Sequence, residues 1–282
     1  MTATHEVLVT GSTGNTGRPL VARLRAQGVP TRAASRHPSP DDHEATRFDW
    51  YDPTTFDNAV AGVRAAYLVP PPLDPDPVAA MAPFLEAAQR SGVSRVVLLG
   101  ASVVETGGPA VGQVQALLPR HVQEWVVLRP SWFMQNFVGD HHHADSARTL
   151  GTITTAAGDG RVAFIDADDI AAVAARLLTA PTVTNEELVL TGPEALSHTS
   201  VAEILTDVLG RPVRHVSVPA SEFERQLAAA MPAPGAKLLA ALDRQIAAGV
   251  EDRTTPGVER VTGRPPKSMR TVLEAAFDAG RR

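Results

Sequence analysis

Short apolar runs alternate with stretches of helical spacing through the first half of the chain. Runs rich in β-branched or small apolar residues lie at 7–9, 31–34, 65–69, 96–99 and 126–128. Between them, apolar residues recur every three or four positions at 18–27 and 78–88. A short, continuously apolar run is typical of a strand buried on both faces, and the longer spacing is typical of a helix. The pattern predicts an α/β fold with a doubly wound parallel sheet of the Rossmann type.

The second half of the chain follows a different pattern. Helical spacing occurs at 168–178, 200–209, 221–230, 237–248 and 271–277, and strand-like runs occur at 187–190 and 213–218. The chain is long enough for one large domain with an added lobe. We expect residues 1–150 to form the dinucleotide-binding Rossmann domain, with part of its core returning around 151–190. Residues 191–282 are expected to form a smaller C-terminal α/β lobe for substrate.

Composition narrows the possible functions. The net charge is -5, no cysteine is present, and hydrophobic residues make up 44% of the chain. A nucleic-acid-binding protein needs a clustered basic face, and disulfide or thiolate chemistry needs cysteine. No apolar run approaches the ~20 residues of a membrane span. We therefore expect a cytoplasmic protein, a monomer or homodimer, whose partner is a small-molecule substrate rather than nucleic acid or a membrane.

A glycine-rich loop follows the first apolar run directly. It reads Gly11-Ser12-Thr13-Gly14-Asn15-Thr16-Gly17 and leads into a helical stretch. Glycine tolerates positive φ and lets a ligand approach the backbone, while the free N–H groups at a helix start favour phosphate. An ordinary tight turn is the alternative, but the strand–loop–helix context favours a dinucleotide site.

The end of the second apolar run bears on the choice of dinucleotide. NAD sites usually carry an acid there, whereas this chain has Ser35 and Arg36. A hydroxyl and a guanidinium suit a 2′-phosphate, so the sequence predicts NADP(H). Arg18 and Arg32 are basic alternatives for the same role.

Other residues follow the ends of later predicted strands. Ligands of parallel sheets lie beyond the carboxyl ends of the strands. We therefore expect cofactor contacts from Asp49 and Trp50 near the adenine, and from Pro70, Pro71, Ala101 and Ser102 near the ribose and nicotinamide. Pro72 would reach the substrate. The three prolines are also consistent with a simple rigid turn.

The usual proton-donating pair of short-chain dehydrogenases, Tyr-x-x-x-Lys, is absent. The two tyrosines are Tyr51 and Tyr67, and the residues four positions later are Thr55 and Pro71. Carbonyl reduction with tyrosine as the acid is therefore disfavoured.

Several motifs together resemble a known family. They are "VTGSTGNTGRPLVARL", "VVLLGAS", "VVLRPSWFMQNF", "DADDIAAVAARLL", "LTGPEALSHTSVAEILTDVLGRPV" and "GVERVTGRPPKSMRTVL". Nearly the whole chain resembles the NmrA-like atypical short-chain dehydrogenases, in the branch of festuclavine-dehydrogenase-like and ergot-alkaloid-type reductases. The resemblance implies a Rossmann fold, an NADP(H) site and substrate bound between the domain and the lobe.

The resemblance also suggests site residues. It places a substrate-cleft wall on Trp132, Phe133, Gln135 and Asn136. It places cofactor contacts on Gly11, Thr13, Gly14, Asn15, Thr16, Gly17 and Arg36. The segment after Ser102 departs from the family pattern, which leaves the substrate open.

Two further clusters invite a chemical role. His141-His142-His143 could suggest a metal, but ligands on a helix need i, i+3 or i, i+4 spacing, and consecutive side chains should point apart. We expect no metal site. Asp166, Asp168 and Asp169 precede an apolar-faced helix, so helix capping accounts for them better than acid–base catalysis.

The sequence therefore predicts an NADPH-dependent reductase that transfers a hydride to a small conjugated electrophile: an iminium, a quinone or an enone. Ser102, Gln135, Asn136 and His142 are the candidates for orienting the substrate or supplying a proton. Two alternatives stay open: a non-catalytic NADP(H)-binding redox sensor, and a non-redox enzyme such as a cyclase or isomerase on the same fold.

Overall fold

A parallel sheet of seven strands forms the core of the larger part of the molecule. The computed structural model describes residues 6–279. The strands are β1 Glu6–Thr10, β2 Thr31–Ser35, β3 Ala45–Arg47, β4 Val63–Leu68, β5 Arg95–Leu99, β6 Glu124–Pro130 and β9 Glu186–Leu190. They lie in the order β3-β2-β1-β4-β5-β6-β9, and every pair is parallel. Chain order reverses between β1 and β4, the place where open α/β sheets bind ligands.

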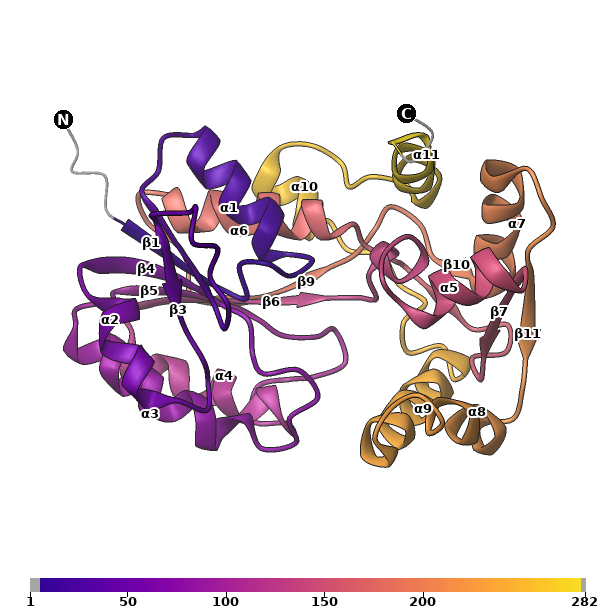
Figure 1. The fold of residues 1–282 in the computed structure, drawn as a ribbon, viewed down its shortest axis with the longest axis horizontal. Helices are drawn as coiled ribbons and strands as arrows, with labels where there is room; N and C mark the ends of the chain where they lie inside the picture. Colours follow the sequence, from indigo (N-terminus) through magenta and orange to yellow (C-terminus); the bar gives the residue numbers. More distant parts are fainter. Residues whose placement is uncertain (1–5, 280–282) are drawn as a thin grey trace. The chain divides into compact units, whose positions relative to one another are not determined.

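Helices cover both faces of this sheet (Figure 1). One face carries α1 Gly17–Ala26, α6 Ala167–Thr179 and α10 Gly257–Thr262, and the other carries α2 Phe56–Val60, α3 Pro77–Arg90 and α4 Val111–His121. A short 3-10 turn, Pro53–Thr55, leads into α2. The expected doubly wound α/β fold is therefore confirmed.

The apolar pattern of the sequence matches the burial of these elements. In β5, Val96, Val97 and Leu98 are fully buried, because helices lie over both faces of the strand. In α1, Leu20 and Leu24 face the sheet with no exposed surface. Each fully buried side chain of this size contributes about 1.5–3 kcal/mol, so the strands and α1 hold the loop between them firmly.

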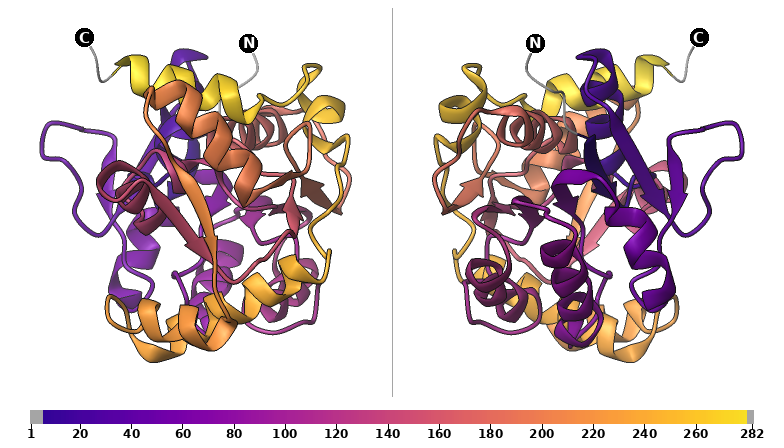
Figure 2. Two further views of the ribbon diagram at one scale, coloured as in Figure 1. Left: turned by 90° about the vertical axis from the view of Figure 1, so that its right-hand side faces the viewer. Right: turned by 90° about the vertical axis from the view of Figure 1, so that its left-hand side faces the viewer.

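The remaining elements form a second, smaller unit. Its helices are α5 His142–Thr149, α7 His198–Leu209, α8 Ala220–Leu227, α9 Ala233–Ala247 and α11 Met269–Ala279, with a 3-10 turn at Met134–Phe137. Its strands are β7 Thr152–Thr155, β8 Arg161–Val162, β10 Leu196–Ser197 and β11 Arg214–Ser217. β7 and β11 run parallel, as Figure 2 shows, and β8 pairs with β10 in the antiparallel sense. An apolar core that includes Phe137, Ile153, Phe164 and Leu205 holds this unit together.

The boundaries of the two units differ from the expected ones. Unit 1 contains the described residues up to Pro130, with Ala167–Leu190 and Gly257–Gly263. Unit 2 contains Ser131–Asp166, Thr191–Pro256 and the described residues from Arg264 onward. The chain enters unit 2 directly after β6 and returns to supply α6 and β9, because β9 completes the sheet beside β6. Local periodicity marks each element but carries no information on which element pairs with which.

No helix within residues 6–279 combines the length and the apolar character that crossing a membrane requires.

Candidate cofactor and active site

The glycine loop turns directly from β1 into α1. Gly11 has a φ of +60°, in the left-handed region that glycine adopts without strain. A Cβ at Gly17 would lie 2.2 Å from the Gly11 carbonyl oxygen, so α1 begins in close contact with the loop backbone. Thr13, Gly14 and Asn15 between them are exposed. The middle of the loop is thus open to a ligand at the positive end of α1, an arrangement that fits a pyrophosphate.

Two loop residues bond the loop to the neighbouring strands β4 and β2. The buried Thr16 hydroxyl accepts a hydrogen bond from the Tyr67 hydroxyl at 3.0 Å. The Ser12 backbone N–H donates to the Ala34 carbonyl at 3.1 Å, which ties the loop to the end of β2. Thr16 was predicted to contact the cofactor, and the structure shows that its hydroxyl is already engaged in holding the loop to β4.

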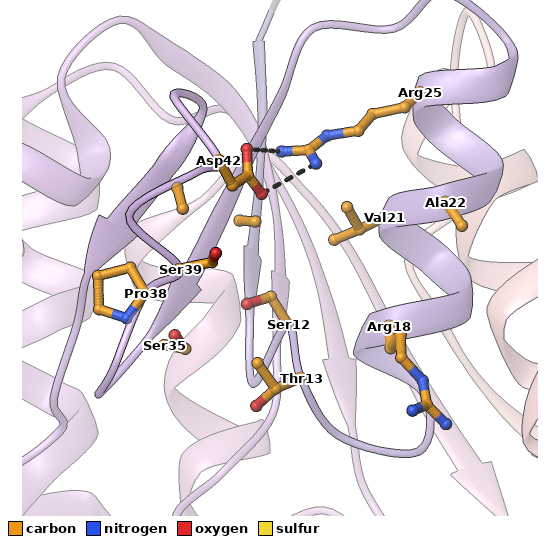
Figure 3. A pocket seen from close by; sticks show the side chains of 12 residues that line it. Ser12, Thr13, Arg18, Val21, Ala22, Arg25, Ser35, Pro38, Ser39 and Asp42 are labelled. Atoms are coloured by element: carbon orange, nitrogen blue, oxygen red, sulfur yellow. Dashed lines mark hydrogen bonds and ion pairs between the residues drawn. The ribbon is translucent and has the colours of Figure 1, made fainter.

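A cavity of about 290 Å³ lies beside the loop (Figure 3). Its wall comes from the loop, from α1 and from the segment that follows β2. The hydroxyl groups on it belong to Ser12, Thr13, Ser35 and Ser39. In size and position, next to the glycine loop and at the carboxyl end of β2, the cavity suits the adenosine side of a dinucleotide.

Two arginines and one acid line this cavity. The Arg25 guanidinium bonds both carboxylate oxygens of Asp42, each at 3.0 Å, and this hydrogen-bonded pairing lowers the pKa of Asp42 (Figure 3). Arg18 is the second arginine on the wall, whereas Arg36 is exposed and lies outside it. Arg32, the other basic alternative, is engaged elsewhere with a carboxylate and three backbone carbonyls.

The acid in this cavity was not anticipated. The sequence has no carboxylate at the end of β2, but Asp42, seven positions beyond Ser35, returns to the cavity through the connection to β3. No spacing rule marks such a return. Because Arg25 bonds both of its oxygens, the charge of Asp42 is balanced by the guanidinium, and the pair repels a phosphate less than an isolated acid would.

The residues expected at the adenine have mixed environments. The Trp50 side chain is 9% exposed, packs against Phe48 and Phe84, and donates its indole N–H to the Val69 carbonyl at 2.9 Å. Its ring belongs to the core, while Asp49 is half-buried at its side. In the proline turn after β4, Pro70 is half-buried, Pro71 is buried and Pro72 is exposed. Their contacts with cofactor or substrate stay predictions.

An arginine holds the turn after β5 in place. Arg129 donates to the Ser102 carbonyl at 2.8 Å, and its other end pairs with Glu187 at 2.7 Å. The Ser102 N–H in turn donates to the Pro130 carbonyl at 2.9 Å, and the residue is 4% exposed. Ser102 therefore lies in a rigid, buried turn, and Ala101 before it is half-buried.

Glu187 anchors this arginine. Burial acts to raise the pKa of Glu187, but the hydrogen bonds from Thr106 and Arg129 outweigh it and leave the pKa below its ordinary value. Sequence reasoning missed this pair. The available signal was a charged residue, Arg129, within the otherwise apolar strand that ends "VVLRP".

In unit 2 the predicted substrate-wall residues surround one 3-10 turn. A parallel bridge pairs Phe133 with Ile165, and the Trp132 carbonyl accepts from the Ile165 N–H at 2.9 Å. These bonds fix Trp132, Phe133, Gln135 and Asn136, all half-buried, on a single short segment. The structure thus brings these four predicted residues together.

A buried carboxylate links this segment to the C-terminal region. Asp166 is 3% exposed and accepts from Gln135 Nε2 at 2.7 Å and from Lys267 Nζ at 2.8 Å. We refer to these three side chains as the Gln135–Asp166–Lys267 network. Sequence reasoning assigned Asp166 to helix capping and gave Lys267 no role, because the three positions are far apart in the chain.

Of the other two acids in the "DADD" stretch, one forms an ion pair and the other is buried. Asp168 accepts from Arg23 at 2.7 Å, which joins α6 to α1, and Asp169 is fully buried within the first turn of α6. Placement at the start of α6 agrees with the expected structural role rather than with acid–base catalysis.

Neither tyrosine is prepared to act as an acid near neutral pH. The hydrogen bond to Asp74, at 2.7 Å, is the largest cause that raises the pKa of the exposed Tyr51 to about 12. Burial raises the pKa of Tyr67 still further, despite its bond to Thr16. These raised pKa values disfavour tyrosine as a proton donor, in line with the expectation from the sequence.

His142 was the remaining catalytic candidate. Burial, followed by repulsion from His141, lowers the pKa of His142 to about 4. The imidazole is therefore neutral at pH 7 and is a poor acid. Contrary to expectation, the three consecutive histidines gather together, with their ligand atoms all within 4.8 Å of one another.

Two family models match overlapping ranges of the chain. One described as NAD(P)H-binding matches residues 11–181, and one described as the NmrA-like family matches residues 124–266. The first covers the glycine loop, the Asp42 cavity and the clamped Ser102 turn.

Individual relatives agree with these matches. The chain is 43% identical to an uncharacterized oxidoreductase of Bacillus subtilis, over 94% of this chain and 93% of that one. It is 40% identical to the agroclavine dehydrogenase of Claviceps fusiformis, over 93% of each chain. Among solved structures, the triphenylmethane reductase of a Citrobacter species, complexed with NADP(H), superimposes with a TM-score of 0.80 at 22% identity. That match covers 96% of this chain and 99% of the other.

The residues fit a nicotinamide dinucleotide: the loop backbone is open at a helix start, and the cavity beside it suits the adenosine half. The expected cofactor class and the resemblance to ergot-alkaloid-type reductases are confirmed by the family models and by relatives at this identity. The chain belongs to the NmrA-like family of NAD(P)H-binding oxidoreductases.

Proposed function

We propose that the protein is an NADPH-dependent reductase of small conjugated electrophiles, with iminium ions, quinones and enones as the substrate classes. The observation that carries this proposal is the exposed centre of the glycine loop, at the switch point of the sheet, in a chain without a tyrosine acid. When bound, NADPH supplies the hydride. The chain's own residues hold the cofactor, orient the electrophile and exclude water.

The choice of NADPH over NADH rests on charge. Two arginines and one paired carboxylate line the cavity, and Arg36 follows Ser35 beside it. A 2′-phosphate brings about two negative charges, which guanidinium groups bind better than any neutral group. Arg18 and Arg36 are the arginines we assign to this phosphate, since Arg25 is paired with Asp42.

The demand for a proton separates the three substrate classes. Hydride addition to an iminium carbon gives a neutral amine, and no proton is needed. Hydride addition to a quinone or an enone leaves an oxyanion or enolate that takes up a proton. We assign the supply of that proton to Lys267, whose ammonium group Asp166 holds at 2.8 Å in the Gln135–Asp166–Lys267 network.

The test is NADPH oxidation, followed at 340 nm, against cyclic imines, quinones and enones, with cofactor binding titrated on the same sample. Turnover on at least one class supports the proposal. Binding without turnover on every class would favour a redox sensor or a non-redox enzyme on this fold, and an absence of binding would contradict the cofactor site itself.

Lys267→Met, with Lys237→Met as the matched control, tests the proton assignment. We expect the Lys267 variant to lose about tenfold or more of kcat on quinones and enones, while iminium reduction changes little. An equal loss on all classes would indicate a structural role, and no loss on any would refute the assignment.

A further inference from the structure

Three consecutive histidines in unit 2 converge although they are neighbours in sequence. His141 is the N-cap of α5, with an extended backbone at φ −149° and ψ 145°, whereas His142 and His143 begin the helix. The change of backbone conformation turns the His141 ring back over the helix start, where its Nδ1 accepts the His143 N–H at 3.2 Å. The ring centroids of His142 and His143 are 3.9 Å apart, and those of His141 and His142 are 4.2 Å apart.

The polar atoms of these rings are incompletely satisfied. Among residues 6–279, His142 Nε2 and His143 Nδ1 are buried and have no hydrogen-bond partner. His143 is 7% exposed, and Phe137 stacks on its ring. An unsatisfied buried polar atom is destabilising, so two in adjacent residues favour a compensating partner.

The neighbours of the cluster are aromatic and acidic. The ring centroid of His198 lies 6.0 Å from that of His143, and that of Phe223 lies 6.4 Å from that of His142. Asp145 places a carboxylate in the first turn of the same helix, where it pairs with Arg148.

We propose that His141, His142 and His143 bind one divalent transition-metal ion of the zinc type. Neutral imidazole nitrogen is a preferred ligand of Zn²⁺, and three such ligands leave a fourth position for water or another small ligand. Tetrahedral Zn–N bonds of about 2.0 Å place the nitrogens about 3.3 Å apart. The ligand atoms lie within 4.8 Å of one another without the ion, so the three side chains must move closer together to bind it. His142 Nε2 and His143 Nδ1, which have no hydrogen-bond partner, would bind the ion. His141 Nδ1 would lose its hydrogen bond from the His143 N–H in order to bind it.

This proposal does not depend on the proposed reduction, although the site adjoins the proposed substrate wall, where Phe137 follows Asn136 and stacks on His143. The three histidines lie in unit 2, and none belongs to the glycine loop or its cavity. The inference also reverses the sequence-based expectation of no metal, because that expectation rested on consecutive side chains pointing apart.

The test is calorimetric titration of untagged, chelator-treated protein with Zn²⁺ alone. We expect one ion per chain, and binding weakened on the order of 100-fold by His142→Ala or by His143→Gln. His43→Ala, which removes an exposed histidine of unit 1, should bind Zn²⁺ as the parent does. Unchanged affinity in both site variants would show adventitious binding and overturn the proposal, as would an absence of saturable binding.

Two measurements keep this result independent of folding. Circular dichroism in the presence of chelator should show that the His142→Ala variant is folded, since this ring is only half-buried. X-ray absorption on the zinc-loaded parent should then show nitrogen neighbours at about 2.0 Å with imidazole scattering. A shell of oxygen ligands alone would contradict the histidine site.

Discussion

At the scale of single residues, the second and third glycines of the loop, Gly14 and Gly17, have different roles. A Cβ at Gly17 meets the Gly11 carbonyl oxygen at 2.2 Å, whereas a Cβ at Gly14 meets the same oxygen at 3.3 Å and is otherwise open. Gly17 is therefore required for the fold of the loop, and Gly14 is required only where a ligand approaches the backbone.

Gly17→Ala and Gly14→Ala separate these tasks. We expect Gly17→Ala to lower the free energy of unfolding by about 1–3 kcal/mol, because the loop must move away from the new methyl group. Gly14→Ala should change stability little and weaken NADPH binding. Urea unfolding and fluorescence titration of NADPH measure the two effects, and undiminished NADPH affinity in Gly14→Ala would contradict the close approach.

The arginines beside the cavity determine the preference for NADPH. Charge-assisted hydrogen bonds contribute about 1.5–3 kcal/mol, so Arg36→Ala and Arg18→Ala should each weaken NADPH binding by about tenfold or more while affecting NADH far less. Arg90→Ala, at an exposed site on α3, is the matched control. Equal losses for NADPH and NADH in both cavity variants would refute a 2′-phosphate role.

At the scale of elements, α9 carries a buried acid whose state depends on pH. Asp243 is 5% exposed, and burial raises its pKa to about 6, although the Ala156 N–H donates to it at 2.7 Å. The folded chain holds the proton more tightly than the unfolded chain, for which an ordinary pKa of 3.8 applies. The favourable contribution of the protonated carboxyl is therefore present at low pH and is lost as pH rises through about 6.

Asp243→Asn isolates this effect. The amide oxygen keeps the bond from Ala156, and the side chain cannot ionise. The free energy of unfolding of the variant minus that of the parent should increase by about 2–3 kcal/mol from pH 4 to pH 7. Urea unfolding at both pH values measures the difference, and a constant difference across this range would contradict the raised pKa.

Local sequence pattern was sufficient for most elements but not for the contacts between them. Apolar runs predicted β1, β2, β4, β5 and β6, since each is a continuous stretch whose residues share one environment. The clamp of Arg129 by Glu187 joins positions on β6 and β9, and the Gln135–Asp166–Lys267 network joins three distant segments. Such pairs depend on which strands and turns become neighbours, and a single sequence does not contain that information.

The histidine cluster shows a different kind of failure. Consecutive side chains point apart within a helix, but His141 is the N-cap and has an extended backbone. The position of a helix start can shift by a residue, and here that residue decides whether the three rings diverge or meet. The Asp42 cavity was missed for a similar reason, because the connection from β2 returns its acid to the strand end.

At the scale of the whole molecule, the division into two units assigns different tasks to different segments. Unit 1 contains the loop, the cavity and the clamped Ser102 turn, which lie at the carboxyl ends of β1, β2 and β5 of one parallel sheet. Unit 2 contains the segment of Trp132, Phe133, Gln135 and Asn136, which is the proposed substrate wall. The fold supports many chemistries, so the reaction must be established by following the transferred atom.

The most direct measurement uses NADPH that carries deuterium at both C4 positions of the nicotinamide, with the best iminium or enone from the substrate panel, because the hydroquinone formed from a quinone exchanges the transferred atom with water. We expect one deuterium bound to carbon in each reduced product molecule, detected by mass spectrometry, with one NADP⁺ formed per product. A product formed without deuterium on carbon, or NADPH that binds and stays unoxidised with every electrophile class, would contradict the assignment of this protein as a hydride-transferring reductase.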